Sequence, residues 1–309
     1  MYIEITYRVK LILIALSVLL PIYVSMLFFL LFSKYHPLAP GERIVEIVPP
    51  FIPLITYKPL YYSITIAIIL GLLPLAIVHT INMKHVNSME MSIPSFMKTV
   101  SEAIKSGIPY LKAIEESSKR GFGVLGKEIG KCMVRVGLGE DFKEAVRAHI
   151  AKFKHSLIIS RALTILAALY GSGGDVANAL DTSAQVLSDI IAFNEEKKAN
   201  MKPYMLIIYL AVILVTFLSF ILIKIFINTL FEMAKGAGVL LAPRLSLKVV
   251  EALFYYLAII EAVFGGLIAG KIYEGRIIGG LIHIVILLTI VLISHTIIFP
   301  FLEGFIRIP

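Results

Sequence analysis

The stretch Gly107-Ile108-Pro109-Tyr110-Leu111-Lys112-Ala113 (GIPYLKA) predicts the end of one helix and the start of the next. Glycine ends a helix at low cost because it adopts the left-handed cap conformation. Proline is tolerated in a first helical turn, where its missing amide proton is harmless. Tyr110 and Ala113 are three residues apart, so they share one face of the helix that follows. The stretch is therefore typical of a hairpin between two helices.

The same spacing occurs three times, as a glycine, an apolar residue three positions later and an alanine six positions later. The copies are Gly107, Tyr110, Ala113; Gly139, Phe142, Ala145; and Gly173, Val176, Ala179. The period is close to that of tetratricopeptide repeats. The chain contains no tryptophan, however, and the aromatic and proline positions of that repeat are not met. Capped helix hairpins account for the pattern without any binding function.

Helical spacing of apolar residues and punctuation by glycine predict six helices around these turns. Phe96, Val100 and Ala103 keep this spacing with charged residues between them, so the helices are amphipathic. Pro94 is expected in the first turn of the first helix. The expected helices are Met89–Ser106, Pro109–Lys119, Val124–Val136, Asp141–Ile150, Ser156–Tyr170 and Asp175–Asn200.

The segments on either side of this polar region are apolar enough to cross a membrane. The chain has 309 residues and 58% hydrophobic content, which exceeds the content of ordinary soluble domains. A spanning helix needs about 20 mostly apolar residues. Five segments qualify or nearly do: Leu11–Phe32, Leu60–Thr80, Pro203–Ile227, Val249–Gly270 and Ile277–Phe301.

The distribution of Lys and Arg predicts the orientation of these spans. The N-terminal stub has Arg8 and Lys10, and the central region holds most of the basic residues. The proline-rich loop after the first span holds only Lys34, Arg43 and Lys58. Positive loops stay in the cytoplasm, so we expect the N-terminus and the central domain there. The proline loop and, after five spans, the C-terminus are expected outside.

These patterns together predict an all-α polytopic membrane protein with about five transmembrane helices and a cytoplasmic six-helix bundle. The expected domains are 1–82 with two spans, 83–202 with the bundle, and 203–309 with three spans. The formal net charge of +8 is compatible with nucleic acid binding. Cytoplasmic retention of basic loops explains this charge in a polytopic protein, and we expect no nucleic acid partner.

The sequence offers little for catalysis or cofactor binding. Gly121, Gly126 and Lys127 resemble part of a phosphate loop, but Glu128 follows the lysine where that motif needs Ser or Thr. The single cysteine, Cys132, cannot form an intrachain disulfide or a cysteine zinc site. We therefore expect no enzymatic activity, no metal and no cofactor.

Glu261 is an intramembrane polar residue, because it lies near the middle of the fourth apolar segment. A carboxylate at that depth costs on the order of 3 kcal/mol, so we expect it to be protonated or paired. Lys224, His283 and His295 are the candidate partners. Gly266 and Gly270 form a small-xxx-small face on the same segment, which predicts close packing within the monomer or across a dimer.

Two further stretches carry a resemblance to a known family. Ile93-Pro94-Ser95-Phe96 and the following Ser106–Ala113 resemble the opening of the type II secretion system protein F domain. Gly139–Ala145 is similar to its mid-domain glycine motif, and Gly171–Asp175 with Leu180 is similar to its closing motif. The resemblance covers about Ser92–Ile227. A single domain copy with two spans before it and three after is closest to the Tad-like pilus-assembly and archaeal branches.

The resemblance implies a non-enzymatic platform protein of the type IV pilus and archaellum-like assembly machinery. Such proteins contact a cytoplasmic hexameric secretion ATPase and pass its motion to pilin-like subunits in the membrane. Lipid and a second copy of the chain are further expected partners, and a second protein F domain would come either from a second copy or from a different subunit. A polytopic transporter and a membrane sensor remain as alternative functions. The candidate ATPase contacts are the basic residues around the glycine turns: Lys112, Lys119, Arg120, Lys143 and Arg147.

Overall fold

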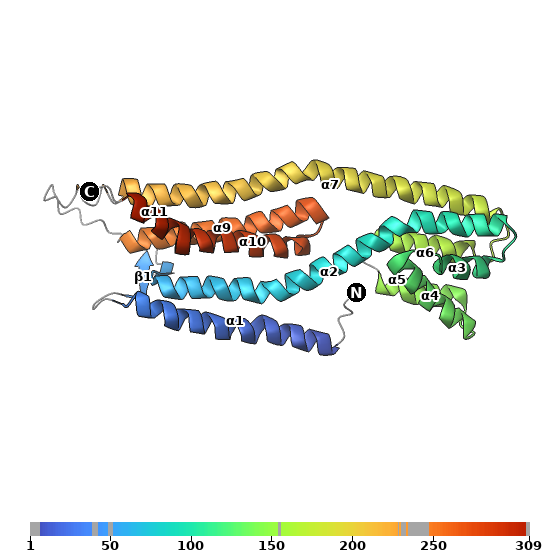
Figure 1. The fold of residues 1–309 in the computed structure, drawn as a ribbon, viewed down its shortest axis with the longest axis horizontal. Helices are drawn as coiled ribbons and strands as arrows, with labels where there is room; N and C mark the ends of the chain where they lie inside the picture. The colour runs from blue at the N-terminus through green and yellow to red at the C-terminus, as the bar shows by residue number, and fades with distance from the viewer. Residues whose placement is uncertain are drawn as a thin grey trace. The chain divides into compact units, whose positions relative to one another are not determined.

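The structure, a computed structural model, describes residues 7–38, 43–48, 52–153, 156–227, 229, 233 and 247–306. Almost all of this part of the chain is helical, which confirms the predicted fold class. The helices are α1 (Tyr7–Tyr35), α2 (Lys58–Lys105), α3 (Tyr110–Ser118), α4 (Gly123–Gly137), α5 (Phe142–Lys152), α6 (Leu157–Leu169), α7 (Val176–Ile221), α9 (Leu247–Glu274), α10 (Gly280–Ile293) and α11 (Phe299–Ile306) (Figure 1). Short π-helices, η1 (Leu222–Ile227) and η3 (Ser294–Ile298), and the 3-10 helix η2 (Ile277–Gly279) adjoin them.

A short β-hairpin is the one departure from helical structure among the described residues. Strands β1 (Val45–Val48) and β2 (Ile52–Ile55) pair antiparallel, with Val45 opposite Ile55. The prolines of this segment predict a loop, and its two strands carry no strong sequence signal. In a two-stranded ribbon each strand has one unpaired edge, so Pro53 is accommodated in β2 without an amide proton. The hydroxyl of Tyr256 donates to the carbonyl of Ile55 at 3.3 Å, which holds the hairpin against α9.

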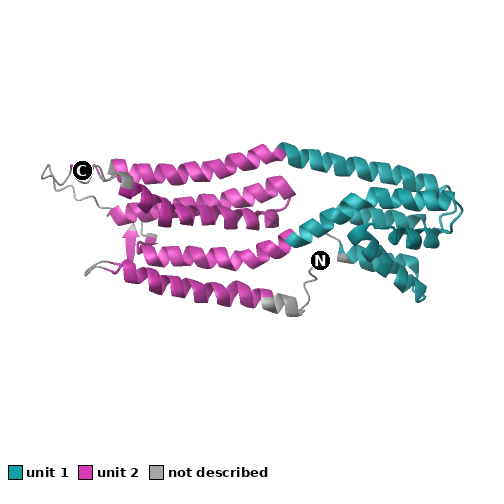
Figure 2. Ribbon diagram, in the orientation of Figure 1, with its two compact units in different colours: residues 1–3, 81–200 teal, residues 4–80, 201–309 magenta. Residues whose placement is uncertain are grey.

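The chain forms two compact units, and each has its own hydrophobic core (Figure 2). One unit, here called the bundle unit, contains residues 81–200. The other, the membrane unit, contains the described residues from 7 to 80 and from 201 to 306. Helices α2 and α7 each contribute one part to the bundle unit and another part to the membrane unit.

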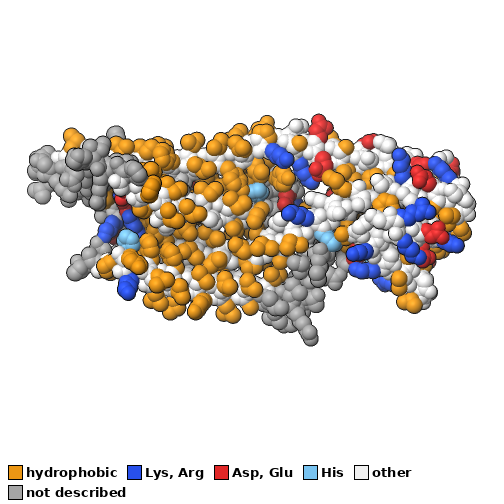
Figure 3. Space-filling model, in the orientation of Figure 1, with side chains coloured by type: hydrophobic (Ala, Val, Ile, Leu, Met, Phe, Trp, Pro, Cys, Tyr) orange, Lys and Arg blue, Asp and Glu red, His pale blue; other side chains and the backbone are white. Residues whose placement is uncertain are grey.

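Five helical segments are long and apolar enough to cross a membrane, as predicted. They are Leu13–Tyr35, Lys58–Lys105, Val176–Ile225, Leu247–Glu274 and Ile277–Gly304, all taken from the described residues. Figure 3 shows hydrophobic side chains over the surface of the membrane unit, whereas acidic and basic side chains gather over the bundle unit. Apolar surface of this kind is stable in contact with lipid rather than with water.

The bundle unit consists of six helical segments, and its short helices begin and end close to their predicted bounds. The first and last segments differ from the prediction, because they continue into the membrane unit as α2 and α7. Pro94 therefore lies inside the 48-residue helix α2 and not in a first turn. Phe96 and Val100, four residues apart on α2, are buried in the core together with Leu125 of α4. The hydroxyl of Ser101 donates to the carbonyl of Ala177 at 2.8 Å and ties α2 to α7.

The core of the membrane unit is built around tyrosines. Tyr255 of α9 is fully buried, and its ring lies 4.7 Å from that of Tyr61 and 5.2 Å from that of Tyr62. Its hydroxyl donates to Thr65 Oγ1 at 2.8 Å. A buried tyrosine hydroxyl needs such a partner because an unsatisfied polar group in an apolar core is costly. These contacts join α2 and α9 far apart in sequence.

Candidate functional site

The three glycine turns share one backbone construction. Gly107, Gly139 and Gly173 have φ of +85°, +95° and +65°, which lies in the left-handed region that favours glycine. In each copy the helix begins three residues later, at Tyr110, Phe142 and Val176. The repeated alanine closes the first helical turn, since its amide donates to the carbonyl of the residue four positions earlier. The three N···O distances are 2.8 Å for Ala113, 3.0 Å for Ala145 and 3.1 Å for Ala179.

The copies differ in what they bury. Ala113 and Ala145 are fully buried, so a larger side chain would not fit at either position. Ala179 is only half-buried, and Ala177 and Leu180 take the buried positions at the start of α7 instead. The third copy therefore buries different positions from the first two, because the buried face of α7 is offset from this alanine.

An aromatic cluster brings the turns together at one end of the bundle unit. Tyr110 begins α3 and Phe142 begins α5, and their ring centroids lie 6.2 Å apart. Tyr170, at the end of α6, lies 5.2 Å from Phe142 and 6.1 Å from Tyr110. The hydroxyl of Tyr110 donates to the carbonyl of Leu166 at 2.7 Å. Burial in this cluster raises the pKa of the Tyr110 phenol above its ordinary value.

The five basic candidate residues fall into two groups. Lys112 lies near the start of α3 and Lys143 near the start of α5, close to the aromatic cluster, with Arg147 one turn further along α5. Lys119 and Arg120 follow the other end of α3. Because α3 has nine residues, its two ends are about 13 Å apart. The sequence analysis expected all five around the first two glycine turns, and it did not resolve this division.

Three of these five residues are paired with glutamates on their own helix. Lys112 lies 3.9 Å from Glu116, Lys119 lies 2.7 Å from Glu115, and Arg147 lies 2.7 Å from Glu144. The hydrogen bond from Lys119 lowers the pKa of Glu115. Exposed pairs of this kind contribute little to stability. Arg120 and Lys143 are exposed and have no ion pair among the described residues, so they are the most available for a partner.

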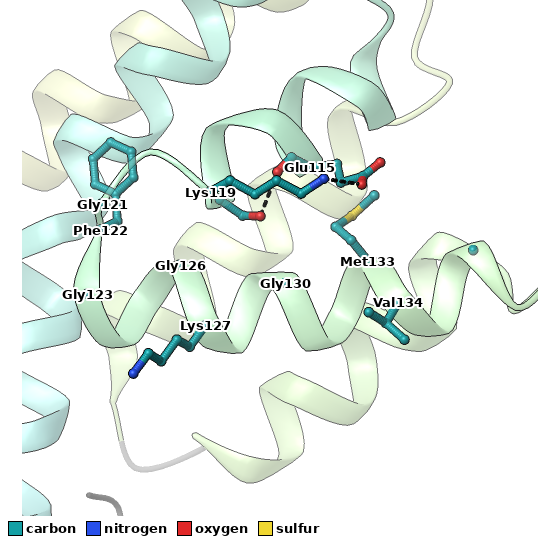
Figure 4. A pocket seen from close by; sticks show the side chains of 12 residues that line it. Glu115, Lys119, Gly121, Phe122, Gly123, Gly126, Lys127, Gly130, Met133 and Val134 are labelled. Carbon is teal, nitrogen blue, oxygen red and sulfur yellow. Dashed lines mark hydrogen bonds and ion pairs between the residues drawn. The ribbon is translucent and has the colours of Figure 1, made fainter.

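A groove of about 660 Å³ lies between α3 and α4 beside this second group (Figure 4). Gly126 of α4 packs so closely on the carbonyl oxygen of Ser118 that any larger residue would collide with it. The glycines give the groove its depth, and Lys119, reaching toward Glu115, borders it. The groove lining consists of Glu115, Ser118, Lys119, Gly121, Phe122, Gly123, Gly126, Lys127, Gly130, Met133, Val134 and Gly137.

The membrane unit contains an ion-pair network that the sequence analysis missed. Glu251 of α9 lies 2.7 Å from Lys58 of α2 and 3.6 Å from Lys224 of η1. Lys224 also lies 2.7 Å from Glu303 of α11. The Glu251 side chain is only 14% exposed, so it needs these counter-charges. These four residues, with His36, His295 and several aromatic rings, line a cavity of about 320 Å³.

Both π-helical segments contribute to this cavity. Lys224 comes from η1, and His295 comes from η3. The rings of Phe220 and Phe299 stack at 4.5 Å beside the two segments. Single-turn π segments are rare and occur frequently at functional sites. A periodicity of 3.6 residues does not reveal them in the sequence, which explains why the analysis of apolar spacing did not find this cavity.

The predicted partners of Glu261 are engaged elsewhere. Lys224 pairs with Glu251 and Glu303, His283 Nδ1 lies 2.7 Å from the Tyr209 hydroxyl, and His295 Nδ1 lies 3.0 Å from the Val291 carbonyl oxygen. The partner prediction was wrong because contacts between helices distant in sequence are not encoded in the local pattern. Glu261 Oε2 is shielded from the surface and has no hydrogen-bond partner among the described residues.

The small-residue face of α9 packs within the chain. A side chain at Gly266 would lie 2.6 Å from the amide nitrogen of Ile284 in α10, and one at Gly270 would collide with the backbone of Gly280. Gly265, on the next face, contacts Ile208 and Val212 of α7. The glycines are therefore explained by close packing of helices within the chain, because α9 crosses its neighbours where these residues have no side chain. Among the described residues, no group of three His, Cys, Asp or Glu side chains could hold a metal ion.

Comparison with known proteins identifies one family. Residues 96–223 match the family model described as Type II secretion system (T2SS), protein F. A relative from Methanocaldococcus jannaschii, described as an uncharacterized protein, is 26% identical over 204 residues. The match covers 66% of this chain and 33% of that protein, so the chain spans about a third of the length of its relative. No solved structure matches the chain.

Proposed function

We propose that this chain, whose residues 96–223 match the family model of T2SS protein F, is a non-enzymatic membrane platform protein of that family. It couples a cytoplasmic secretion ATPase to the assembly of a type IV pilus-like filament from subunits held in the membrane. The observation that carries this proposal is the continuity of α2 and α7 between the bundle unit and the membrane unit.

Continuous helices suit a protein that transmits movement. Helix α2 has 48 residues and α7 has 46, and each has one part in the bundle unit and the other in the membrane unit. A flexible linker would absorb a displacement of the bundle, whereas a helix is a stiff element that carries it along its axis. Two such helices, tied together by the Ser101 hydrogen bond and the Lys105–Asp181 ion pair, would carry a displacement together.

The charge distribution supports a cytoplasmic bundle. The bundle unit carries most of the Lys and Arg residues, and the segment between the first two spans carries few. Positively charged segments near spans are retained in the cytoplasm. The bundle would then meet the ATPase, and the hairpin β1–β2 would lie outside.

The docking face for the ATPase consists of the α3–α4 groove together with Arg120 and Lys143, the two basic candidate residues that have no ion pair among the described residues. Arg120 lies at the end of α3 beside the groove, and Lys143 lies at the start of α5. Both are exposed without an ion pair among the described residues, so binding an acidic partner surface breaks no existing pair. Complementary charge raises association rates and makes them dependent on salt.

The test is capture of the ATPase and the filament subunits by the full-length protein from membranes of its own host. Arg120→Glu together with Lys143→Glu should weaken ATPase binding by about tenfold, since close charge pairs across interfaces are worth 1.5 kcal/mol or more. Lys197→Glu is the matched control, because Lys197 is an exposed lysine of α7 that lies away from the groove lining. It should leave ATPase binding unchanged.

Two outcomes would contradict the proposal. Unchanged ATPase affinity and salt dependence in the double variant would remove the α3–α4 face from consideration. A protein that retains neither an ATPase nor filament subunits, and instead moves a solute across vesicles, would favour the alternative transporter function.

A further inference from the structure

Glu261 is an ionisable group in the membrane unit that the structure leaves without a partner. It is the fifteenth of the 28 residues of α9 and therefore lies near the middle of this span. Its Oε2 atom is shielded from the surface and forms no hydrogen bond with any described residue. A carboxyl group at this depth is costly and is usually paired with another polar group.

Three other carboxylates of the membrane unit, Glu251, Glu274 and Glu303, differ from Glu261 in having a basic group nearby. Glu251 and Glu303 share Lys224, and Glu251 also pairs with Lys58. Glu274 Oε2, at the end of α9, also has no hydrogen-bond partner among the described residues, but it lies 3.8 Å from His79 Nδ1. The fold thus supplies a nearby basic group to each of these three carboxylates and supplies none to Glu261.

The interior faces of α9 are already occupied. Ala258 and Ala262 are fully buried, and Gly265, Gly266 and Gly270 contact α7 and α10. A donor for Glu261 therefore has to reach the remaining, outward side of the helix. The Glu261 side chain as a whole is partly exposed, although its Oε2 atom is shielded, and helical spacing places the residue beside that outward side.

Next to Glu261 runs a stripe of exposed apolar side chains, here called the α9 stripe. It consists of Leu257, Ile260, Phe264 and Ile268, which are 49%, 53%, 62% and 51% exposed. Their spacing of three and four residues places them along one side of the helix. A large apolar stripe beside a buried polar group is the surface that a second membrane helix would cover.

We propose that the α9 stripe binds a transmembrane helix of another protein that carries a hydrogen-bond donor, such as a lysine or an amide, near its middle. The donor satisfies Glu261, while the apolar side chains around it contact the stripe. A second copy of this chain fits less well, because two stripes meeting across a two-fold axis would bring two carboxyl groups together without a donor. This inference does not depend on the function proposed above, because it requires only a membrane helix of this chemistry.

The test uses the full-length protein in vesicles of zwitterionic phospholipid. Synthetic Leu/Ala transmembrane peptides with a central lysine, asparagine or leucine are added, and association is measured by energy transfer to a label on the protein. The lysine and asparagine peptides should associate at least fivefold more tightly than the leucine peptide. Glu261→Leu should abolish this difference, and Glu261→Gln should retain part of it, because an amide still accepts a hydrogen bond.

Matched controls separate the stripe from general effects. Phe264→Ala should weaken binding of all three peptides, whereas Ile297→Ala, at another exposed apolar position in η3, should not. Equal association of the three peptides with the wild-type protein would overturn the proposal. So would a lysine preference that survives Glu261→Leu. Energy transfer between two labelled copies of the chain that is lost in Glu261→Leu, without peptide binding, would assign the stripe to a dimer and would also overturn the proposal.

No ATPase and no filament subunit takes part in this assay, so its failure is distinct from a failure of the proposed function. If Glu261→Leu does not fold, the comparison of the three peptides on the wild-type protein and on Glu261→Gln still decides the question.

Discussion

Gly107 and Gly139 are required by the backbone rather than by a lack of space. A side chain added at either position would meet no atom within 4 Å, yet the φ values of +85° and +95° are ones that other residues rarely adopt. The amide of Ile108 donates to the carbonyl of Ala103 at 3.1 Å, and that of Glu140 donates to Arg135 at 3.2 Å. These bonds satisfy carbonyls at the helix end, as in a Schellman cap.

We expect Gly107→Ala and Gly139→Ala each to lower the free energy of unfolding by about 1–2 kcal/mol, the cost of the left-handed conformation for an L-residue. Gly174→Ala is the control, because Gly174 has neither a positive φ nor a close neighbour. Thermal unfolding of the purified full-length protein measures the difference. Equal melting of all three variants would show that the turns tolerate a Cβ atom.

The sequence predicted these turns well because their signals are local. Gly139, Asp141 and Phe142 define one turn within four residues, and the Asp141 side chain accepts from the amide of Lys143 as an N-cap. Contacts between distant residues carried no such signal. Lys58 and Glu251 lie in different helices, α2 and α9, and only the packed fold brings them within 2.7 Å.

Ion pairs join the ends of four helical elements in the membrane unit. Lys224 of η1 is shared by Glu251 of α9 and Glu303 of α11, and Lys58 of α2 completes the network. Because η1 directly continues α7, the network fixes this end of α7 to its neighbours. If one partner is removed from this partly buried network, a carboxylate is left without its counter-charge.

We expect Lys224→Met to lower the free energy of unfolding by about 1–3 kcal/mol, less than for a fully buried pair because the network is partly exposed. Glu303→Gln should cost less, since Lys224 keeps Glu251. Lys34→Met is the control, because Lys34 is exposed and forms no ion pair with the described residues. Unfolding in detergent measures all three. A melting temperature of Lys224→Met equal to that of the control would reduce the network to a surface feature.

The elements themselves were predicted more accurately than their junctions. The analysis separated the bundle from the spans near residue 83 and near residue 202, where the composition changes. The structure continues α2 and α7 through both regions. The hydropathy of a helix reflects the solvent around it. It therefore changes at a membrane boundary even where the backbone continues as one helix. Pro94 was misplaced for the same reason.

At the scale of the whole molecule, the orientation in the membrane can be tested with introduced cysteines. Ser172→Cys marks an exposed turn of the bundle unit, and Ile47→Cys marks β1 of the hairpin, where the residue is 71% exposed. An impermeant thiol reagent applied to intact cells should label the cysteine at 47 and leave the one at 172 unlabelled. The reverse pattern would invert the proposed topology.

The unmodified protein, whose single cysteine is Cys132, is the negative control for this labelling experiment. Cys132 is buried in α4, and burial raises its pKa to about 11. The thiol is therefore protonated near neutral pH and reacts slowly, because the thiolate is the reactive form. The unmodified protein should remain unlabelled from either side of the membrane until it is unfolded.

In an unbroken helix, the number of residues between two side chains sets the angle between the directions in which they point. Each residue of an α-helix turns the chain by about 100°. A single residue gained or lost in α2 near residue 81 or in α7 near residue 200, where the units meet along the chain, would turn one end by that angle. Lys224, Glu251 and Glu303 all follow residue 200 and would keep their contacts, so the strain would fall on the helix that carries the change. Length changes of about seven residues, close to two full turns, would preserve the alignment.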